Sequence, residues 1–169
     1  MKQELKNAYE KVSTGTELRA GLIEMKNLLK EEKNRRELAY QLGGDFKILT
    51  RCFSDEDPKV RKNAALVLGA MESDDLVPVL LNAYKKEDTL FVKSAYLKAL
   101  FDLDYEEELP YLKERLQELD ETPVTEENQK HLREEAGMLQ QLISQKEKHK
   151  KHTFDGFDRQ VEVILLTNR

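Results

Sequence analysis

The feature that most constrains the fold is a pattern that repeats every 31–32 residues in the middle of the chain. The segments Phe53–Met71 and Tyr84–Leu103 align with a shift of 31 residues at their start and 32 residues from Val60 onward. The 32-residue shift superimposes Val60 on Val92, Leu68 on Leu100 and, in the segment that follows each, Pro78 on Pro110. A fixed period of this length is typical of stacked helical hairpins, in which each unit buries its apolar face only against its neighbours.

Hydrophobic spacing extends the pattern toward both ends of the chain. Thr16 is a plausible N-cap for a helix with Leu18, Leu22, Met25 and Leu29 on one face, and Asn34–Leu42 is expected to be its partner helix. Segments Glu106–Leu119 and Thr125–Lys146 are expected to form the last hairpin. We therefore predict an all-α fold, a right-handed α-α superhelix of about four helical hairpins over residues 1–151.

The first of the two central units carries a recognisable motif. The string DEDPKVRKNAALVLGAM resembles the HEAT-repeat family through Asp55, Pro58, Val60, Arg61, Ala64, Ala65, Leu68 and Gly69. The next unit has Tyr96 and Leu97 where the two alanines stand. The resemblance covers roughly Thr16 to Lys146. It implies a HEAT-like solenoid, and it speaks to the fold more than to an activity.

Residues 152–169 break the pattern. Val163–Leu166 is apolar on both faces, as in a strand buried inside a sheet, so we expect a short non-helical or β tail. This segment is expected to be either the linker and first strand of a following domain of the same polypeptide or a tail docked on the last hairpin. It is similar to the entry into the catalytic domain of bacterial RNA methyltransferases that have a helical amino-terminal extension, although no glycine-rich cofactor loop is present.

Composition and motifs exclude most chemistry. The chain has a net charge of −5, no run of apolar residues long enough for a membrane span, and no Walker, Gly-x-Ser-x-Gly or zinc-ligand pattern. Its one cysteine, Cys52, lies on an apolar stripe and is expected to be a buried thiol. We expect no enzyme activity in this chain, no metal or other cofactor, no membrane association, and a cytoplasmic location.

Acidic residues concentrate between Asp102 and Glu127, where eleven carboxylates face only Lys113 and Arg115. They are interpreted either as a patch for a basic partner or as solvated helix ends, and the second interpretation is favoured because several lie near helix amino termini.

A helical projection of the repeats predicts one candidate binding surface. Opposite the apolar face, the aligned units place Arg36, Tyr40, Lys62, Leu66, Ser94, Lys98 and Phe101. This set is interpreted either as a concave recognition groove or, for Leu66 and Phe101, as ordinary packing between repeats. A second set, Met138, Leu142, Phe154 and Phe157, is predicted to dock the tail or the following domain.

These patterns predict a non-catalytic module for protein–protein interaction or scaffolding, with a protein or peptide partner. The alternative is an amino-terminal targeting module of a larger nucleic-acid-modifying enzyme such as an RNA methyltransferase. RNA is favoured over duplex DNA as a nucleic-acid partner because the chain has no tryptophan and is acidic overall.

Overall fold

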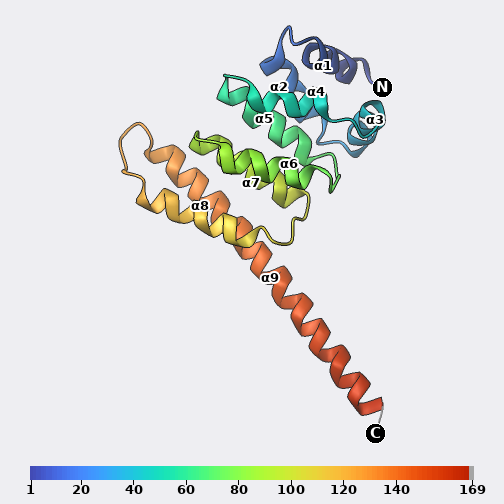
Figure 1. Ribbon diagram of the computed structural model, residues 1–169, viewed down its shortest axis with the longest axis vertical. Helices are drawn as coiled ribbons and strands as arrows, with labels where there is room; N and C mark the ends of the chain where they lie inside the picture. Colours follow the sequence, from blue (N-terminus) through green and yellow to red (C-terminus); the bar gives the residue numbers. More distant parts are fainter. Residues whose placement is uncertain (168–169) are drawn as a thin grey trace. The chain divides into compact units, whose positions relative to one another are not determined.

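The computed structural model describes the backbone of residues 1–167 and the side chains of residues 1–149. Over that part the chain is all-α, with no β-strand (Figure 1). The helices are α1 (Gln3–Thr14), α2 (Leu18–Leu28), α3 (Glu32–Leu42), α4 (Lys47–Thr50), the 3₁₀ helix η1 (Arg51–Ser54), α5 (Pro58–Gly69), α6 (Leu76–Lys86), α7 (Leu90–Asp102), α8 (Leu109–Glu121) and α9 (Gln129–Thr167).

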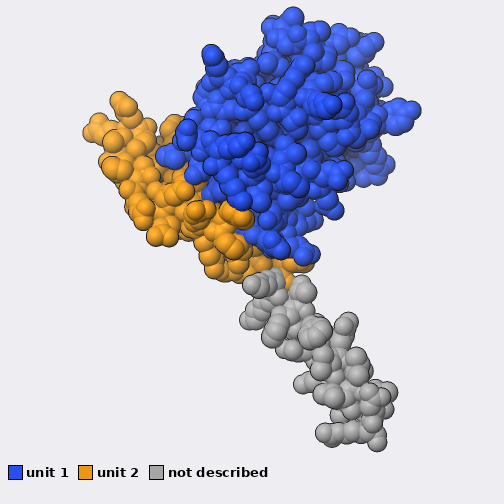
Figure 2. Space-filling model, in the orientation of Figure 1, with its two compact units in different colours: residues 1–108 blue, residues 109–169 orange. Residues whose placement is uncertain are grey.

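The chain forms two compact units, residues 1–108 and residues 109–169, which Figure 2 colours separately. Unit 1 contains the hairpins α1–α2, α4/η1–α5 and α6–α7, and unit 2 is the hairpin α8–α9. Within unit 1 the second helices of the three hairpins pack side by side in the order α2, α5, α7. The predicted HEAT-like solenoid of helical hairpins is therefore confirmed.

The 32-residue period is visible in the backbone as well as in the sequence. Outside glycine, the described backbone has positive φ at only two residues, Glu72 (54°) and Asp104 (56°), and these are 32 residues apart. Each stands two or three residues past the end of its helix, α5 or α7. A left-handed residue at this place reverses the chain after the second helix of a hairpin, as in an αL helix cap.

Helix α5 shows why the motif forms a helix here. Asp57 is its N-cap, and its carboxylate accepts a hydrogen bond from the backbone N–H of Lys59 at 2.9 Å. Pro58 occupies the first helical position, where no N–H partner is needed. Near the other end, Gly69 lies so close to α7 that a Cβ there would be 2.8 Å from the Ala99 Cα. A glycine is required because α5 and α7 approach at this point.

The predicted first hairpin is wrong. Helix α2 pairs with α1, and α3 is not the second helix of a repeat. Instead, α3 caps the end of α2: the Asn34 side chain donates to the Leu28 carbonyl at 2.7 Å, and Arg35 donates to the Leu29 carbonyl at 2.8 Å. These bonds satisfy carbonyl groups that a helix end leaves without partners. Similarly, the N-cap residue of α2 is Glu17 and not Thr16.

The predicted β tail is also wrong, because the backbone of α9 is helical to Thr167. A lone strand would leave its backbone groups unpaired, whereas a helix pairs them within the same segment. The side chains of Phe154 and Phe157 lie outside those that the structure describes. The domain division at residue 151 stays a prediction.

Candidate binding surface on the stacked helices

Helix α5 leaves one stripe open between its two neighbours. The Asn63 side chain bonds to Lys26 of α2, and Gly69, at the end of α5, lies against Ala99 of α7. The side chains that remain are Lys59, which is exposed, and Lys62 and Leu66, which are half-buried. Two of the residues predicted from sequence, Lys62 and Leu66, therefore lie on a helix surface that is partly open to solvent.

The same stripe continues on α7, but with a change. Phe91 is 41% exposed and Lys98 is half-buried, one i, i+7 step apart on one helix face. Ser94, which was predicted to belong to the surface, is only 5% exposed and lies in the interior. Phe101 is half-buried and its ring centroid lies 5.6 Å from the Lys98 Nζ atom.

Helix α2 completes the stack with residues that the sequence analysis missed. Arg19, Ile23, Lys26 and Lys30 follow the spacing i, i+4, i+7, i+11, so they form one stripe along α2 and the turn that follows it. The Lys26 Nζ atom donates to Asn63 Oδ1 on α5 at 3.2 Å, and the Arg19 guanidinium lies 3.9 Å from the Asp57 carboxylate. The sequence analysis missed this stripe because it took α3 as the helix stacked on α5. The i, i+4, i+7, i+11 spacing of the four α2 residues was the sequence signal that could have identified the stripe.

The two residues that α3 supplied to the predicted surface lie elsewhere. Arg36 forms an ion pair with Glu32 on its own helix, and Tyr40 is 88% exposed. Helix α3 lies beside the amino terminus of α1, where the backbone N–H of Lys2 donates to Glu37 at 3.3 Å. Arg36 and Tyr40 are therefore not part of the α2–α5–α7 stack.

We define the basic face by the side chains that α2, α5 and α7 leave open on this side. Its members are Arg19, Ile23, Lys26, Lys30, Lys59, Lys62, Leu66, Phe91 and Lys98.

The basic face concentrates positive charge with little internal compensation. Burial lowers the pKa of Lys26, and the neighbouring ammonium groups of Lys62 and Lys30 lower it further. Lys26, Lys30, Lys59 and Lys62 form no ion pair with any side chain among residues 1–149. Lys98 is paired with Asp102 on the same helix. The Lys62 ammonium also lies 6.0 Å from the Phe91 ring centroid, at the outer limit of a cation–π contact.

An ion pair between Arg61 and Glu87, here called the clamp, connects two successive repeats beside the basic face. Arg61 donates from Nε and Nη2 to the two Glu87 carboxylate oxygens, each at 2.9 Å, and from Nη1 to the Asp55 carbonyl at 2.8 Å. Burial alone would raise the pKa of Glu87, but hydrogen bonds from Arg61 and from the Thr89 and Asp88 backbone outweigh it and lower that pKa. The clamp ties the loop before α5 to the loop before α7, so these two helices are held in register.

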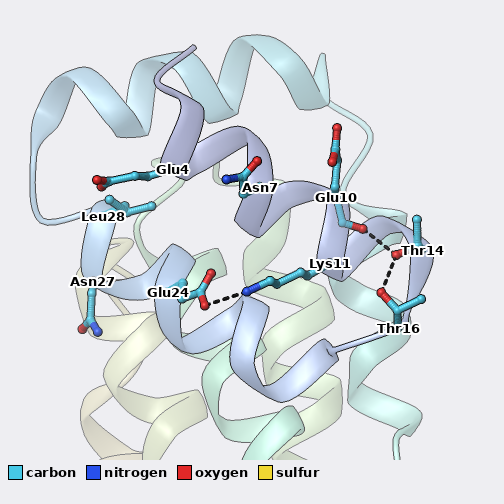
Figure 3. Close-up of a pocket in the computed structure, with 9 residues that line it drawn as sticks. All are labelled: Glu4, Asn7, Glu10, Lys11, Thr14, Thr16, Glu24, Asn27 and Leu28. Carbon is cyan, nitrogen blue, oxygen red and sulfur yellow. Dashed lines mark hydrogen bonds and ion pairs between the residues drawn. The ribbon is translucent and has the colours of Figure 1, made fainter.

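A polar groove of about 870 Å³ between α1 and α2 is a weaker candidate (Figure 3). Its lining groups bond to each other: Lys11 Nζ lies 2.8 Å from the Glu24 carboxylate, and Thr14 Oγ1 donates to the Glu10 carbonyl at 2.7 Å. The hydrogen bond that Lys11 donates to Glu24 is the largest of the effects that raise the pKa of Lys11. No histidine or cysteine lines the groove, so it holds no activated nucleophile of the usual kind.

Other chemistry is sparse where side chains are described. Cys52 is a free, buried thiol, as predicted, and burial raises its pKa, which disfavours the reactive thiolate. Residues 1–149 contain no cluster of three potential metal ligands. No helix in the described part of the chain is both long and apolar enough to cross a membrane.

The predicted docking residues fall on α9 in unit 2. Met138 is half-buried and Leu142 is buried. Phe154 and Phe157 have no described side chains, so docking through these four residues stays a prediction.

Comparison with known proteins gives one match. A family model described as HEAT repeats matches residues 46–130, from the start of α4 into the first turn of α9. No curated protein and no solved structure matches the chain.

Proposed function

Because the chain belongs to the HEAT-repeat family, whose members typically mediate protein–protein interaction, we propose that it is a non-catalytic module that binds another protein through the basic face. The partner is a protein or peptide, and the module acts as a scaffold that presents one surface of a helical stack.

One observation carries this proposal: three consecutive stacked helices each leave a stripe open on the same side. The stripes combine apolar side chains with cations. Ile23 is 36% and Phe91 is 41% exposed, and Leu66 between them is half-buried. Contiguous apolar surface rimmed by polar groups is a common mark of an interaction site. A rigid stack also loses little conformational entropy on binding.

Nucleic-acid binding is the second candidate, and the unpaired lysines of the basic face favour it. A single strand would bind through phosphate contacts and base stacking. The face offers little to stack on, since Phe91 is its only aromatic member. The comparisons lend no support to an RNA methyltransferase relationship.

Site-specific photo-crosslinking in the producing cells tests the proposal. A photo-reactive amino acid at Leu66 on the face is expected to give discrete protease-sensitive adducts. The same amino acid at Val79, which is 39% exposed on α6, is the matched control and is expected to give none.

Two outcomes would contradict the proposal. Equal adducts from Leu66 and Val79 would remove the basic face as the binding surface. Adducts from Leu66 that nuclease removes and protease does not would replace the protein partner with a nucleic acid.

A further inference from the structure

We infer that the ligand of the basic face is an extended acidic peptide segment of a protein partner, in which carboxylates alternate with aliphatic side chains. This inference rests on the proposed function and narrows it to one chemical class of partner.

The spacing of the lysines suits an extended chain that crosses the helices. Each of the three stacked helices contributes at least one lysine to the face, and Lys26, Lys62 and Lys98 form a row with one lysine per helix. Packed helices lie roughly 8–10 Å apart, and an extended peptide rises about 3.3 Å per residue. A carboxylate every second or third residue therefore meets the lysine of each successive helix, and about seven to nine residues cross all three.

The apolar members of the face fit the other side chains of such a peptide. Ile23 on α2, Leu66 on α5 and Phe91 on α7 provide one apolar contact per helix. Side chains at i and i+2 of an extended peptide point to the same side, so aliphatic residues that share a side with the carboxylates can lie against these three. Apolar contacts of this kind would add to the affinity that the ion pairs with the lysines provide.

The charges of the face are arranged for an anionic ligand. Lys26, Lys30 and Lys62 lie close enough to repel one another, and residues 1–149 supply none of them with an ion-pair partner. A bound carboxylate would relieve this repulsion, so its binding is favoured by more than a single ion pair. The rest of the chain is acidic, with a net charge of −5, so the concentration of cations on one face is local.

An acidic peptide fits the composition of the face better than a phosphate backbone does. Phosphate recognition commonly uses the planar guanidinium fork of arginine. The only arginine of the face, Arg19, lies 3.9 Å from the Asp57 carboxylate. Two of the three apolar members are aliphatic, which suits leucine or valine side chains and leaves Phe91 as the only ring of the face on which a base could stack.

The test is fluorescence anisotropy with a labelled peptide of about ten residues that alternates Glu with Leu and Ser, at about 50 mM and about 300 mM NaCl. We expect binding that weakens with salt. The same peptide with Gln in place of Glu is expected to bind at least about tenfold more weakly, because it cannot relieve the repulsion among the lysines.

A pair of charge-matched variants assigns the binding to the face. The triple variant K26E/K62E/K98E is expected to lose at least about tenfold in affinity. The control K6E/K33E/K47E makes the same change in net charge at exposed lysines outside the face and is expected to stay within about threefold of the parent chain. Circular dichroism checks folding, and K26Q/K62Q/K98Q, which introduces no new charge, is expected to show an intermediate loss.

The inference is overturned if both triple variants lose affinity equally, if the Gln peptide binds as well as the Glu peptide, or if single-stranded RNA displaces the peptide more effectively than unlabelled peptide does. Failure of the Glu peptide to bind, together with protein adducts from Leu66, would overturn the acidic ligand and leave the proposed function standing. Absence of those adducts would contradict the proposed function itself.

Discussion

The α5–α7 contact in unit 1 and the α8–α9 hairpin in unit 2 are stabilised in different ways. Between α5 and α7 the helices approach through small residues, with Gly69 against Ala99 and no ion pair in the contact centre. Between α8 and α9 the fully buried Arg115 donates from Nη1 to Glu118 and from Nε to Glu135, at 2.8 and 2.9 Å. The centre of the α5–α7 contact therefore depends on shape, and the centre of the α8–α9 contact depends on charge.

Because the two contacts differ, substitutions in them should change the stability of the protein in different ways. A close apolar contact tolerates no added volume, because atoms in a well-packed core have nowhere to move. A buried ion pair tolerates volume changes better, but it does not tolerate the loss of one charge, since the other charge then stays buried without compensation. The four predictions below run from the largest expected effect to the smallest.

Replacing Arg115 with Ala is expected to destabilise unit 2 by about 3 kcal/mol, because the Glu135 carboxylate, whose side chain is mostly buried, loses its cation. Hydrogen exchange of α8 amides, or urea unfolding followed by circular dichroism, measures the loss. Arg133→Ala in the same hairpin is the control, since Arg133 is exposed, and it is expected to change stability by less than about 0.5 kcal/mol. Equal effects of the two variants would mean that the buried ion pair does not stabilise the hairpin.

Replacing Gly69 with Ala is expected to destabilise unit 1 by about 2 kcal/mol, although alanine favours helix more than glycine does. The added Cβ would stand 2.8 Å from the Ala99 Cα, which belongs to the backbone and cannot rotate away. Urea unfolding measures the change.

Gly137 on α9 is the matched control, because nothing lies within 4 Å of a Cβ built there. Gly137→Ala is expected to stabilise the protein by up to about 1 kcal/mol. Stabilisation of both variants would show that α5 and α7 can move apart freely, and the comparison with α8–α9 would fail.

Replacing Glu87 with Gln is expected to cost about 1–2 kcal/mol at pH 7, because the charged pair with Arg61 is lost while the shape is kept. The pKa of Glu87 is lowered in the folded protein. Its contribution is therefore present above the unfolded value of about 4.3 and lost as pH falls through the lower folded pKa.

Unfolding in urea at about pH 7, 5 and 3 checks this expectation. The difference between the parent chain and Glu87→Gln should be present at pH 7 and should decrease as the pH is lowered toward the folded pKa of Glu87. Glu10→Gln, at an exposed position, should follow the parent chain throughout. A difference between parent and Glu87→Gln that stays constant with pH would show that the clamp acts through shape and not through charge.

Replacing Tyr96 with Phe is expected to stabilise unit 1 by up to about 1 kcal/mol, because the Tyr96 hydroxyl is buried and has no hydrogen-bond partner among the described residues. The edge-to-face contact of its ring with Phe53, at 5.1 Å between centroids, is kept. Thermal unfolding measures the shift. Tyr40→Phe, at an exposed site, should leave it unchanged, and a loss of stability in Tyr96→Phe would mean that the hydroxyl has a stabilising role.

Much of the fold could be predicted from the sequence because apolar periodicity is a local signal. Val60, Leu68, Val92 and Leu100 were assigned to the core by repeat alignment, and all four are buried. The last hairpin was also placed to within a few residues at three of its four boundaries, but α9 continues to Thr167, well past the predicted end at Lys146. The alignment failed at Ser94, which matched the position of the half-buried Lys62 but is itself buried.

The candidate surface could be predicted only in part. Lys62, Leu66 and Lys98 were found because they repeat with the period, whereas Lys26 and Lys30 were missed because the helix that carries them was assigned to the wrong position in its hairpin. The hydrophobic periodicity of a helix indicates which of its side chains point away from the core of its own hairpin. It does not indicate which other helix packs beside those side chains.

By itself, the sequence determined that this chain forms helical hairpins of one period and which side of each central helix is apolar, because both depend on spacing within a few turns. Only the tertiary structure decided that α2 stacks on α5, that Arg61 binds Glu87 and that the buried Arg115 binds Glu135. Those pairings join residues 20 or more positions apart, and their free energy depends on burial and on geometry that no local pattern encodes.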